Sequence, residues 1–255
     1  MSDTRLNAAK YYDLNPNVPD DIPFYRKMIL SPEANVLELG CGTGRVLLSL
    51  IEHCEFIHGL DNSEAMLEFC RKGLKSSFIP RSKALITHND ITDFSLKQRF
   101  DLIIAPFRVF QNLETDAQVQ GLLFNIKEHL KPNGRCILNV FNPKYSPEEL
   151  LHWQSSEEEL NWEIPAPDGR ITCHDVRRSI DLKNRILYPQ LIYREYKNDQ
   201  LIGETILNIV MRCYYPDEFK QLIRDNGFRI LNTWGGYHGE AYGEGNELII
   251  QFCNQ

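Results

Sequence analysis

The order of apolar, amphipathic and turn-forming segments predicts an α/β fold. Up to about residue 145, short apolar runs alternate with amphipathic stretches, which is typical of a mostly parallel sheet whose crossover helices cover both faces. Beyond that point, runs of about ten residues rich in β-branched and aromatic side chains are separated by turn signals, a pattern that favours antiparallel hairpins. A last helix and two strands then close the chain.

Five strands are expected in the first part of the chain, at residues 36–39, 56–60, 84–87, 102–105 and 136–141. Apolar residues at helical spacing predict the intervening helices at 43–54, 63–75 and 115–130. The sequence Lys131-Pro132-Asn133-Gly134 predicts a helix stop followed by a turn.

The antiparallel segment spans about residues 162–215. Its turns are predicted at Pro167-Asp168-Gly169, Lys183-Asn184 and Asn198-Asp199. Pro216 then opens a helix that Asn226-Gly227 closes, and strands follow at 228–233 and 247–252. We therefore expect one domain built from residues 1–145 and 215–255, with residues 146–214 as an antiparallel insert.

Composition and charge exclude several classes of protein. The chain is 42% apolar and 25% charged, which is ordinary for a globular protein. Its net charge is -7, with -2 in residues 1–150 and -5 in residues 151–255, so it lacks the basic surface that nucleic acids require. No apolar run approaches the roughly 20 residues that span a bilayer, and no membrane partner is expected.

The seven cysteines are odd in number and scattered, and no two are spaced as Cys-x-x-Cys. This pattern argues against a disulfide framework and against a zinc site, so no metal is expected. The N-terminal sequence lacks the basic and then apolar build of a signal peptide. We therefore expect a cytoplasmic location.

The most specific local signal is a strand that runs into the glycine loop Gly40-Cys41-Gly42-Thr43-Gly44 and then into a helix. Glycines let the backbone approach a ligand closely, and a helix start offers unpaired N–H groups. A nucleotide-binding P-loop needs a lysine that is absent here. A dinucleotide loop places its third glycine where Arg45 stands, which weighs against a nicotinamide-dependent oxidoreductase without excluding one.

With Glu38 two positions before its first glycine, the loop resembles that of the class I S-adenosylmethionine-dependent methyltransferases, which usually open with Glu/Asp-x-Gly-x-Gly-x-Gly. The resemblance covers roughly residues 33–142 and includes Asp61 after the second strand and Asn89-Asp90-Ile91 after the third. It implies a Rossmann-like, seven-stranded, mostly parallel sheet with S-adenosyl-L-methionine as cofactor. A carboxylate suits the ribose because it accepts two hydrogen bonds at once.

The resemblance also assigns contacts to the three parts of the cofactor. The loop glycines and Glu38 are expected at the methionine part, Asp61 and Asn62 at the ribose, and Met66 with Asp90 and Ile91 at the adenine. The full set of expected cofactor contacts is Tyr12, Tyr25, Glu38, Gly40, Cys41, Gly42, Gly44, Arg45, Asp61, Asn62, Met66, Asp90, Ile91 and Pro106.

Ligands of open α/β sheets bind beyond the carboxyl ends of the strands, so the methyl acceptor should meet residues that follow the fourth and fifth strands. These segments are 106–112 and Asn142-Pro143-Lys144-Tyr145. An Arg108 that faces the pocket would grip a carboxylate or phosphate of the acceptor. The full set of expected substrate contacts is Tyr11, Phe107, Arg108, Gln111, His174 and Tyr237. His174 and His238 are both candidate bases, and no catalytic residue is assigned.

The expected activity is methyl transfer to a nitrogen or oxygen atom of a small molecule, by direct in-line displacement. Ala105-Pro106-Phe107-Arg108 replaces the Asn/Asp-Pro-Pro-Tyr/Phe sequence of the DNA amino-methyltransferases, which agrees with the charge. The insert resembles the lid of small-molecule methyltransferases, but a homodimer surface is the alternative. A non-catalytic protein that binds S-adenosylmethionine is the remaining alternative function.

Overall fold

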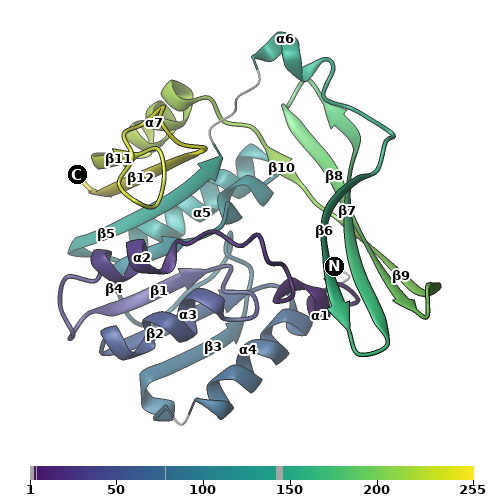
Figure 1. Ribbon diagram of the computed structural model, residues 1–255. Coiled ribbons are helices and arrows are strands. Elements are labelled where there is room, and N and C mark those ends of the chain that lie inside the picture. The colour runs from purple at the N-terminus through teal and green to yellow at the C-terminus, as the bar shows by residue number, and fades with distance from the viewer. Residues whose placement is uncertain (1–2, 4, 78, 142–145) are drawn as a thin grey trace.

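A seven-stranded sheet forms the centre of the protein (Figure 1). The computed structural model describes residues 3, 5–77, 79–141 and 146–255. The strands of this sheet are β1 Asn35–Leu39, β2 Phe56–Asp61, β3 Ala84–His88, β4 Phe100–Ala105, β5 Leu130–Phe141, β11 Phe228–Trp234 and β12 Glu247–Asn254. Their order is β11-β12-β5-β4-β1-β2-β3, and only β12 runs antiparallel to its neighbours. The predicted fold class is confirmed.

Helices cover both faces of the sheet because its strands are apolar on both sides. Leu37 and Leu39 of β1 face a cluster that includes α5 Asp116–His129 and α7 Pro216–Asp225. Val36 alternates to the other face, where it meets α2 Ile22–Met28, α3 Arg45–Leu50 and α4 Glu64–Ser76. A strand that is buried on both faces carries a continuous apolar run, and the sequence predicts the strands from such runs. The short helices of the described residues are α1 Ala9–Tyr12, α6 Pro147–Leu150, η1 Ile51–His53, η2 Arg81–Lys83 and η3 Val109–Asn112.

Two helices start where the sequence indicates. The hydroxyl of Ser63 accepts a hydrogen bond from the N–H of Met66 at 3.2 Å and caps α4, and Thr115 forms a capping box with Gln118 at α5.

The predicted stop of α5 is confirmed, but the predicted turn before the fifth strand is wrong. Strand β5 already begins at Leu130, which pairs with Phe100, and the next pair joins Arg135 to Leu102. Residues 131–134 therefore bulge out within β5, because one residue of β4 faces four residues there.

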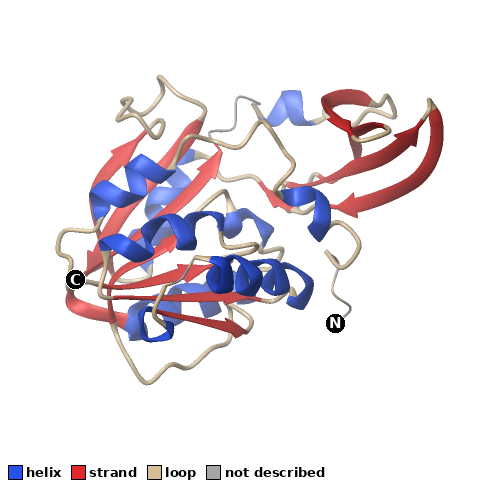
Figure 2. Ribbon diagram, turned by 60° about the horizontal axis from the view of Figure 1, so that its bottom comes forward, coloured by secondary structure: helices blue, strands red, loops and turns tan. Residues whose placement is uncertain are grey.

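The insert folds into a second, antiparallel sheet, which we call the lid sheet (Figure 2). Its strands are β6 Glu159–Ala166, β7 Gly169–Asp181, β8 Ile186–Lys197, β9 Gln200–Asn208 and β10 Met211–Arg212. The order is β10-β8-β7-β6, and β9 also pairs with β8. The three predicted turns connect β6 to β7, β7 to β8 and β8 to β9.

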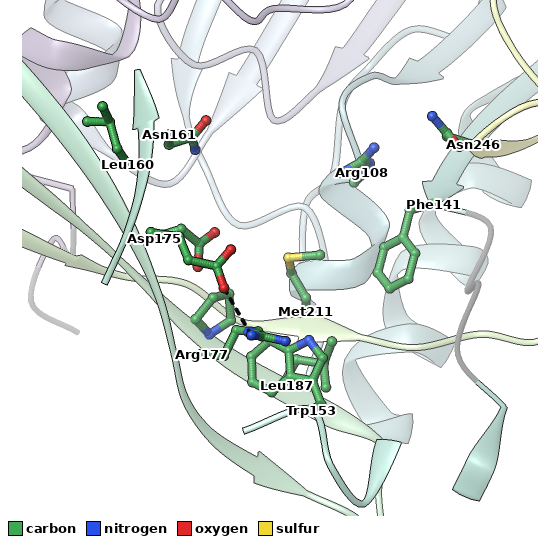
Figure 3. A pocket seen from close by; sticks show the side chains of 12 residues that line it. Arg108, Phe141, Trp153, Leu160, Asn161, Asp175, Arg177, Leu187, Met211 and Asn246 are labelled. Atoms are coloured by element: carbon green, nitrogen blue, oxygen red, sulfur yellow. Dashed lines mark hydrogen bonds and ion pairs between the residues drawn. The ribbon is translucent and has the colours of Figure 1, made fainter. Parts of the chain in front are cut away.

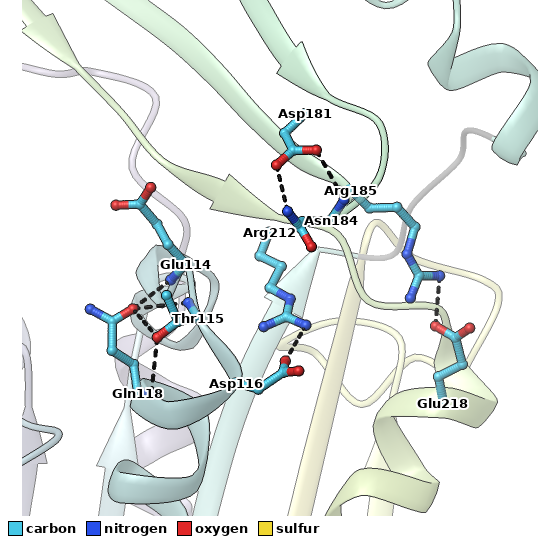
Figure 4. A network of polar contacts seen from close by, with 9 residues as sticks. All are labelled: Glu114, Thr115, Asp116, Gln118, Asp181, Asn184, Arg185, Arg212 and Glu218. Carbon is cyan, nitrogen blue, oxygen red and sulfur yellow. Dashed lines mark hydrogen bonds and ion pairs between the residues drawn. The ribbon is translucent and has the colours of Figure 1, made fainter.

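Ion pairs fix the base of the lid sheet to the main domain (Figure 4). Arg212 of β10 pairs with Asp116 at 2.6 Å, and Arg185 pairs with Glu218 at 2.8 Å. Both acids lie in the first turn of a helix, where the helix dipole also favours a negative charge. Such exposed pairs contribute little stability individually, but they set the position of the lid sheet against α5 and α7.

The N-terminal segment, residues 5–21, joins the lid sheet to the main domain, and we call it the strap (Figure 1). The ring of Tyr11 stacks on Tyr193 of β8 with the centroids 4.5 Å apart, and its hydroxyl donates to Glu195 at 2.6 Å. Further along, the side-chain amide of Asn17 donates to the carbonyl oxygen of Asn161 in β6 at 3.2 Å. None of the helices formed by the described residues is long and apolar enough to cross a bilayer.

Candidate cofactor and acceptor site

The glycine loop lies at the carboxyl end of β1 and adopts a conformation that requires glycine. Gly40, Gly42 and Gly44 have φ angles of 70°, 54° and 90°, which side chains disfavour. A Cβ on Gly40 would lie 2.6 Å from Cγ2 of Val109, in the segment after β4. The loop therefore packs directly against the post-β4 segment, and the two predicted parts of the site are adjacent.

Asp61 lies at the end of β2 and binds the glycine loop. One carboxylate oxygen accepts the N–H of Gly42 and the other accepts the N–H of Ser63, each at 2.8 Å. Burial raises the pKa of Asp61, while these two hydrogen bonds act to lower it. Each oxygen keeps a lone pair for a further donor, so the side chain fits the predicted contact with ribose hydroxyls.

Glu38 is the strongest indication that the site fits the cofactor. Its side chain is 2% exposed, and Oε2 has no hydrogen-bond partner among the described residues. Burial raises the pKa of this carboxyl well above its ordinary value. A buried carboxylate without a partner is costly, and the amino group of the methionine part would supply the missing donor. The residues present therefore fit S-adenosylmethionine.

Changing Glu38→Gln should separate stability from cofactor binding. In the cofactor-free protein the folded state keeps a proton on Glu38 that the unfolded state releases above its ordinary pKa of 4.5. Folding stability therefore falls as the pH rises from that value towards the raised folded pKa. The glutamine variant lacks this loss, so it should melt at a higher temperature than the wild type at pH 8.

The same variant should bind S-adenosylhomocysteine about 10 to 100 times more weakly, because a charge-assisted hydrogen bond is lost. Thermal melts at pH 5.5 and pH 8 and calorimetric titration measure the two effects. Glu52→Gln, an exposed carboxylate in η1, is the matched control. Equal pH dependence in Glu38→Gln and wild type would contradict the assignment.

The side chains predicted at the ribose and adenine lie along the ends of β2 and β3. The carbonyl oxygen of Asp61 accepts the N–H of Asn89 at 2.9 Å, which joins the two strand ends. Met66 is 3% exposed, and its Cε lies 3.3 Å from where a Cβ on Gly42 would be. Asn62 is exposed, and its carbonyl oxygen accepts from Nε2 of His88.

Asp90 and Ile91 follow β3 directly. Asp90 is exposed, and one of its oxygens accepts both the N–H and the hydroxyl of Thr92 at 2.8 Å. Ile91 is partly buried against the main core. The contacts of both residues with adenine stay predictions.

The strap is attached to the glycine loop by two contacts that the sequence does not reveal. Asp21 is fully buried, and its two carboxylate oxygens accept hydrogen bonds from the two terminal guanidinium nitrogens of Arg45 at 2.6 and 2.8 Å. The hydroxyl of Thr43 donates to Asp13 at 2.6 Å. The expected direct cofactor contact of Arg45 is therefore corrected, because its guanidinium is occupied by Asp21 and holds the strap in place.

Two more expected cofactor contacts belong to buried side chains and stay predictions. Tyr25 is 0% exposed and packs in the core against Phe24 and Tyr237. Cys41 is also buried in this core, and a hydrogen bond with Cys70, together with burial, raises the pKa of its thiol. Tyr12 is partly exposed, and its ring lies edge-on to Phe107 at 6.5 Å, beside the predicted site.

The segment after β4 is strained, and a buried polar network supports it. It starts at the buried Pro106, and Phe107 and Arg108 have φ angles of 51° and 65°, which few non-glycine residues adopt. The N–H of Arg108 donates to Oδ1 of Asn139 in β5 at 3.0 Å. Asn139 in turn donates to Glu247 of β12 at 2.8 Å. The strain presents the side chain of Arg108 beyond the end of the sheet.

Arg108 lines the cavity between the lid sheet and the ends of β4 and β5, but the anion-binding fork expected of it is held by an acid of the protein. Its Nη2 lies 2.5 Å from Oε1 of Glu247, and its Nε lies 3.4 Å from Oε2. The fork is thus already filled by a carboxylate of the protein. Neither Asn139 nor Glu247 is identified by the sequence patterns, because they pair with Arg108 across large separations in the chain.

Gln111 and Tyr11 have structural partners that occupy them fully. Gln111 is 0% exposed, donates to the carbonyl oxygen of Arg212 at 2.9 Å and accepts from the N–H of Phe141 at 2.8 Å. Tyr11 is 2% exposed and is held by Tyr193 and Glu195. The substrate contacts expected of both side chains are therefore corrected.

His174 and Tyr237 lie away from the cavity. His174 is preceded in β7 by Cys173, in the core below the strap, and followed by Asp175, which lines the cavity. Strand alternation places His174 on the opposite face, where its Nε2 meets the hydroxyl of Thr172 at 3.2 Å. Tyr237 packs against Phe24 with the ring centroids 5.8 Å apart. The substrate contacts expected of His174 and Tyr237 stay predictions that this cavity does not support.

A cavity of about 660 Å³ lies between the lid sheet and the carboxyl ends of β4 and β5 (Figure 3). Its apolar lining consists of Phe141, Trp153, Leu160, Leu187, Pro189 and Met211. Its polar lining consists of Arg108, Glu159, Asn161, Asp175, Arg177 and Asn246. The predicted segment 142–145 lies outside the described residues, so its contribution stays a prediction. The described residues contain no cluster of three or more His, Cys, Asp or Glu side chains that could hold a metal.

The lining from the lid sheet is the part that the sequence does not reveal. Side chains alternate along a strand, so Asp175 and Arg177 lie on the same face of β7, and the sequence alone predicts this. One face of the lid sheet packs against the strap. No local sequence pattern predicts which face this is.

Comparisons with known proteins agree with this geometry. A family model described as a methyltransferase domain matches residues 36–134. The dTDP-3-amino-3,4,6-trideoxy-alpha-D-glucopyranose N,N-dimethyltransferase of Streptomyces venezuelae is 30% identical over 220 residues, which cover 83% of this chain and 82% of that protein. A carboxy-S-adenosyl-L-methionine synthase of Shewanella sediminis (strain HAW-EB3) is 24% identical over 252 residues, covering 92% of this chain and 88% of that protein.

The fold agrees as well. The solved structure of the CcbJ methyltransferase from Streptomyces caelestis matches with a TM-score of 0.81 at 18% identity, over 99% of this chain and 98% of that one. S-adenosyl-L-methionine is therefore the cofactor. The contacts of the glycine loop, Glu38 and Asp61 with it stay predictions. The chain belongs to the class I S-adenosylmethionine-dependent methyltransferases.

Proposed function

We propose that this enzyme methylates an amino group of a small, sugar-like molecule that binds in the cavity under the lid sheet. One observation carries the proposal: the cavity of about 660 Å³ opens beside Arg108, and the segment after β4 packs on the glycine loop through Val109 and Gly40. That volume suits a small molecule. The relative from Streptomyces venezuelae, which is named for an amino-sugar substrate, supports nitrogen as the methylated atom.

The chain has to do little chemistry of its own. Bound S-adenosylmethionine supplies a methyl group that its sulfonium already activates. The lid sheet covers one side of the cavity, and the apolar wall of Phe141, Trp153 and Met211 orients an acceptor beside Arg108. An amine needs only to arrive with its lone pair free. The nicotinamide alternative is set aside, since Arg45 in place of the third glycine is bound to Asp21.

A matched pair of acceptors tests the proposal. Wild-type enzyme with labelled S-adenosylmethionine should convert methyl 3-amino-3,4,6-trideoxy-α-D-glucopyranoside to a product heavier by one methyl group in place of a hydrogen. The 3-hydroxy analogue should remain unchanged. Mass spectrometry reads both reactions. Methylation of the hydroxyl analogue alone would assign the enzyme to oxygen acceptors, and methylation of neither analogue or any other amine would favour a non-catalytic protein.

The role of the insert and the cellular location of the protein are also proposals. Residues 146–214 are proposed as a lid unit, because one face of the lid sheet lines the cavity. A homodimer surface remains the other role of this insert, and Leu201 and Ile202 of β9 are exposed there. All seven cysteines are buried and free, which supports the proposed cytoplasmic location.

A further inference from the structure

The lid sheet places a carboxylate without a partner in the wall of the acceptor cavity. Asp175 of β7 is half-buried and lines the cavity (Figure 3). In the strand register it lies opposite Glu159 of β6. None of the described residues donates a hydrogen bond to its carboxylate. Burial and, after it, the carboxylate of Glu159 raise the pKa of Asp175, while the charge of Arg177 acts to lower it. A carboxylate that accepts no hydrogen bond in the cavity wall gains from an N–H donor that enters the cavity.

The two cations of the described cavity wall are already neutralised inside the protein. Arg177 pairs with Glu159 at 3.0 Å, and Arg108 pairs with Glu247 at 2.5 Å. The charge left unmatched in this wall is therefore the negative charge of Asp175. Among the described residues, the wall offers a carboxylate to an N–H donor and no unpaired guanidinium to a phosphate.

We propose that Asp175 is a specificity-determining residue whose carboxylate accepts a hydrogen bond from an N–H of the acceptor's amino group, which leaves the nitrogen lone pair free for methyl transfer, and that the acceptor enters without a nucleoside diphosphate. This inference rests on the proposed function. It also separates this enzyme from its relative, whose name specifies a dTDP-linked sugar. In the described part of the wall, two phosphates would lie beside a carboxylate and beside guanidinium groups that acids of the protein already hold, which disfavours that class of acceptor.

The test compares two probes that share one amino sugar. They are methyl 3-amino-3,4,6-trideoxy-α-D-glucopyranoside and the same sugar linked to dTDP. Both are titrated calorimetrically into the full-length protein saturated with S-adenosylhomocysteine, and both are assayed with S-adenosylmethionine. The glycoside should bind at least tenfold more tightly than the nucleotide-linked sugar. Tighter binding of the nucleotide-linked sugar, or no binding of either probe, overturns the inference.

Variants isolate the carboxylate. Asp175→Asn should raise KM for the glycoside about 10- to 100-fold, the loss expected for one charge-assisted hydrogen bond, while kcat changes less than twofold. Asp175→Lys should shift the preference towards the dTDP-linked sugar. Glu163→Gln, an exposed carboxylate of β6 outside the cavity lining, is the matched control. An unchanged KM in Asp175→Asn contradicts the inference, and thermal melts confirm that each variant is folded.

The two failures are distinguishable. If the glycoside binds and Asp175→Asn weakens it, but no amine is methylated, the proposed function fails and the binding site stands. If the dTDP-linked amine is methylated in preference, the proposed function stands and the inference fails.

Discussion

Asp61→Ala should abolish S-adenosylmethionine binding. The substitution removes the predicted acceptor for the ribose hydroxyls and also the two hydrogen bonds that hold the N–H groups of Gly42 and Ser63. Each charge-assisted hydrogen bond to a ligand contributes about 1.5–3 kcal/mol, so losing two weakens binding by roughly a hundredfold or more. Calorimetric titration with S-adenosylhomocysteine measures the loss.

Two further variants show whether the effect belongs to this carboxylate. Glu64→Gln changes an exposed acid in the first turn of α4, where it pairs only with Arg71, and should bind the cofactor normally. Asp90→Asn should have an intermediate effect, because Asp90 is exposed and shares its carboxylate with Thr92. Wild-type affinity in a folded Asp61→Ala protein would contradict the ribose assignment.

The sequence predicts those parts of the fold and site whose determinants are local. Strands buried on both faces, caps such as Ser63 and glycines with positive φ each leave a mark within a few residues. Asp61 belongs to this class, because strand β2 ends there and α4 begins three residues later. The predicted cofactor half of the site rests on local determinants of this kind.

The acceptor half depends on contacts that join distant parts of the chain. Arg108 pairs with Glu247, Gln111 binds Arg212, and Arg177 pairs with Glu159 across two strands. The sequence shows which residue types stand at these positions, but it does not show which protein groups they bind. It therefore predicts ligand contacts for an arginine and a glutamine after a strand end whose hydrogen bonds are made within the protein.

The lid sheet and the main domain meet through the strap, and this arrangement couples the two halves of the site. The strap contacts β8 through Tyr11, β6 through Asn17 and the glycine loop region through Asp13 and Asp21. A change that frees the strap should therefore affect cofactor binding through these contacts between protein side chains.

Asp21→Ala is the sharpest test of this coupling. Asp21 is fully buried, and Arg45 is 18% exposed, so the alanine variant leaves a largely buried guanidinium without its partner. Breaking such a pair from one side costs about 3–5 kcal/mol. In a chain of this size that corresponds to a fall in Tm of roughly 6–20 °C. Asp20→Ala, which removes the adjacent exposed carboxylate, should leave Tm unchanged.

The double variant Asp21→Leu with Arg45→Met separates folding from function. Replacing both members of a buried pair by apolar side chains of similar volume restores most of the lost stability, because no charge is left unpaired. The strap then packs without the directional fork of Arg45, whose two hydrogen bonds fix the start of α3 to the strap. We therefore expect near-normal Tm together with at least tenfold weaker binding of S-adenosylhomocysteine. Recovery of both properties would mean that the ion pair only stabilises the fold.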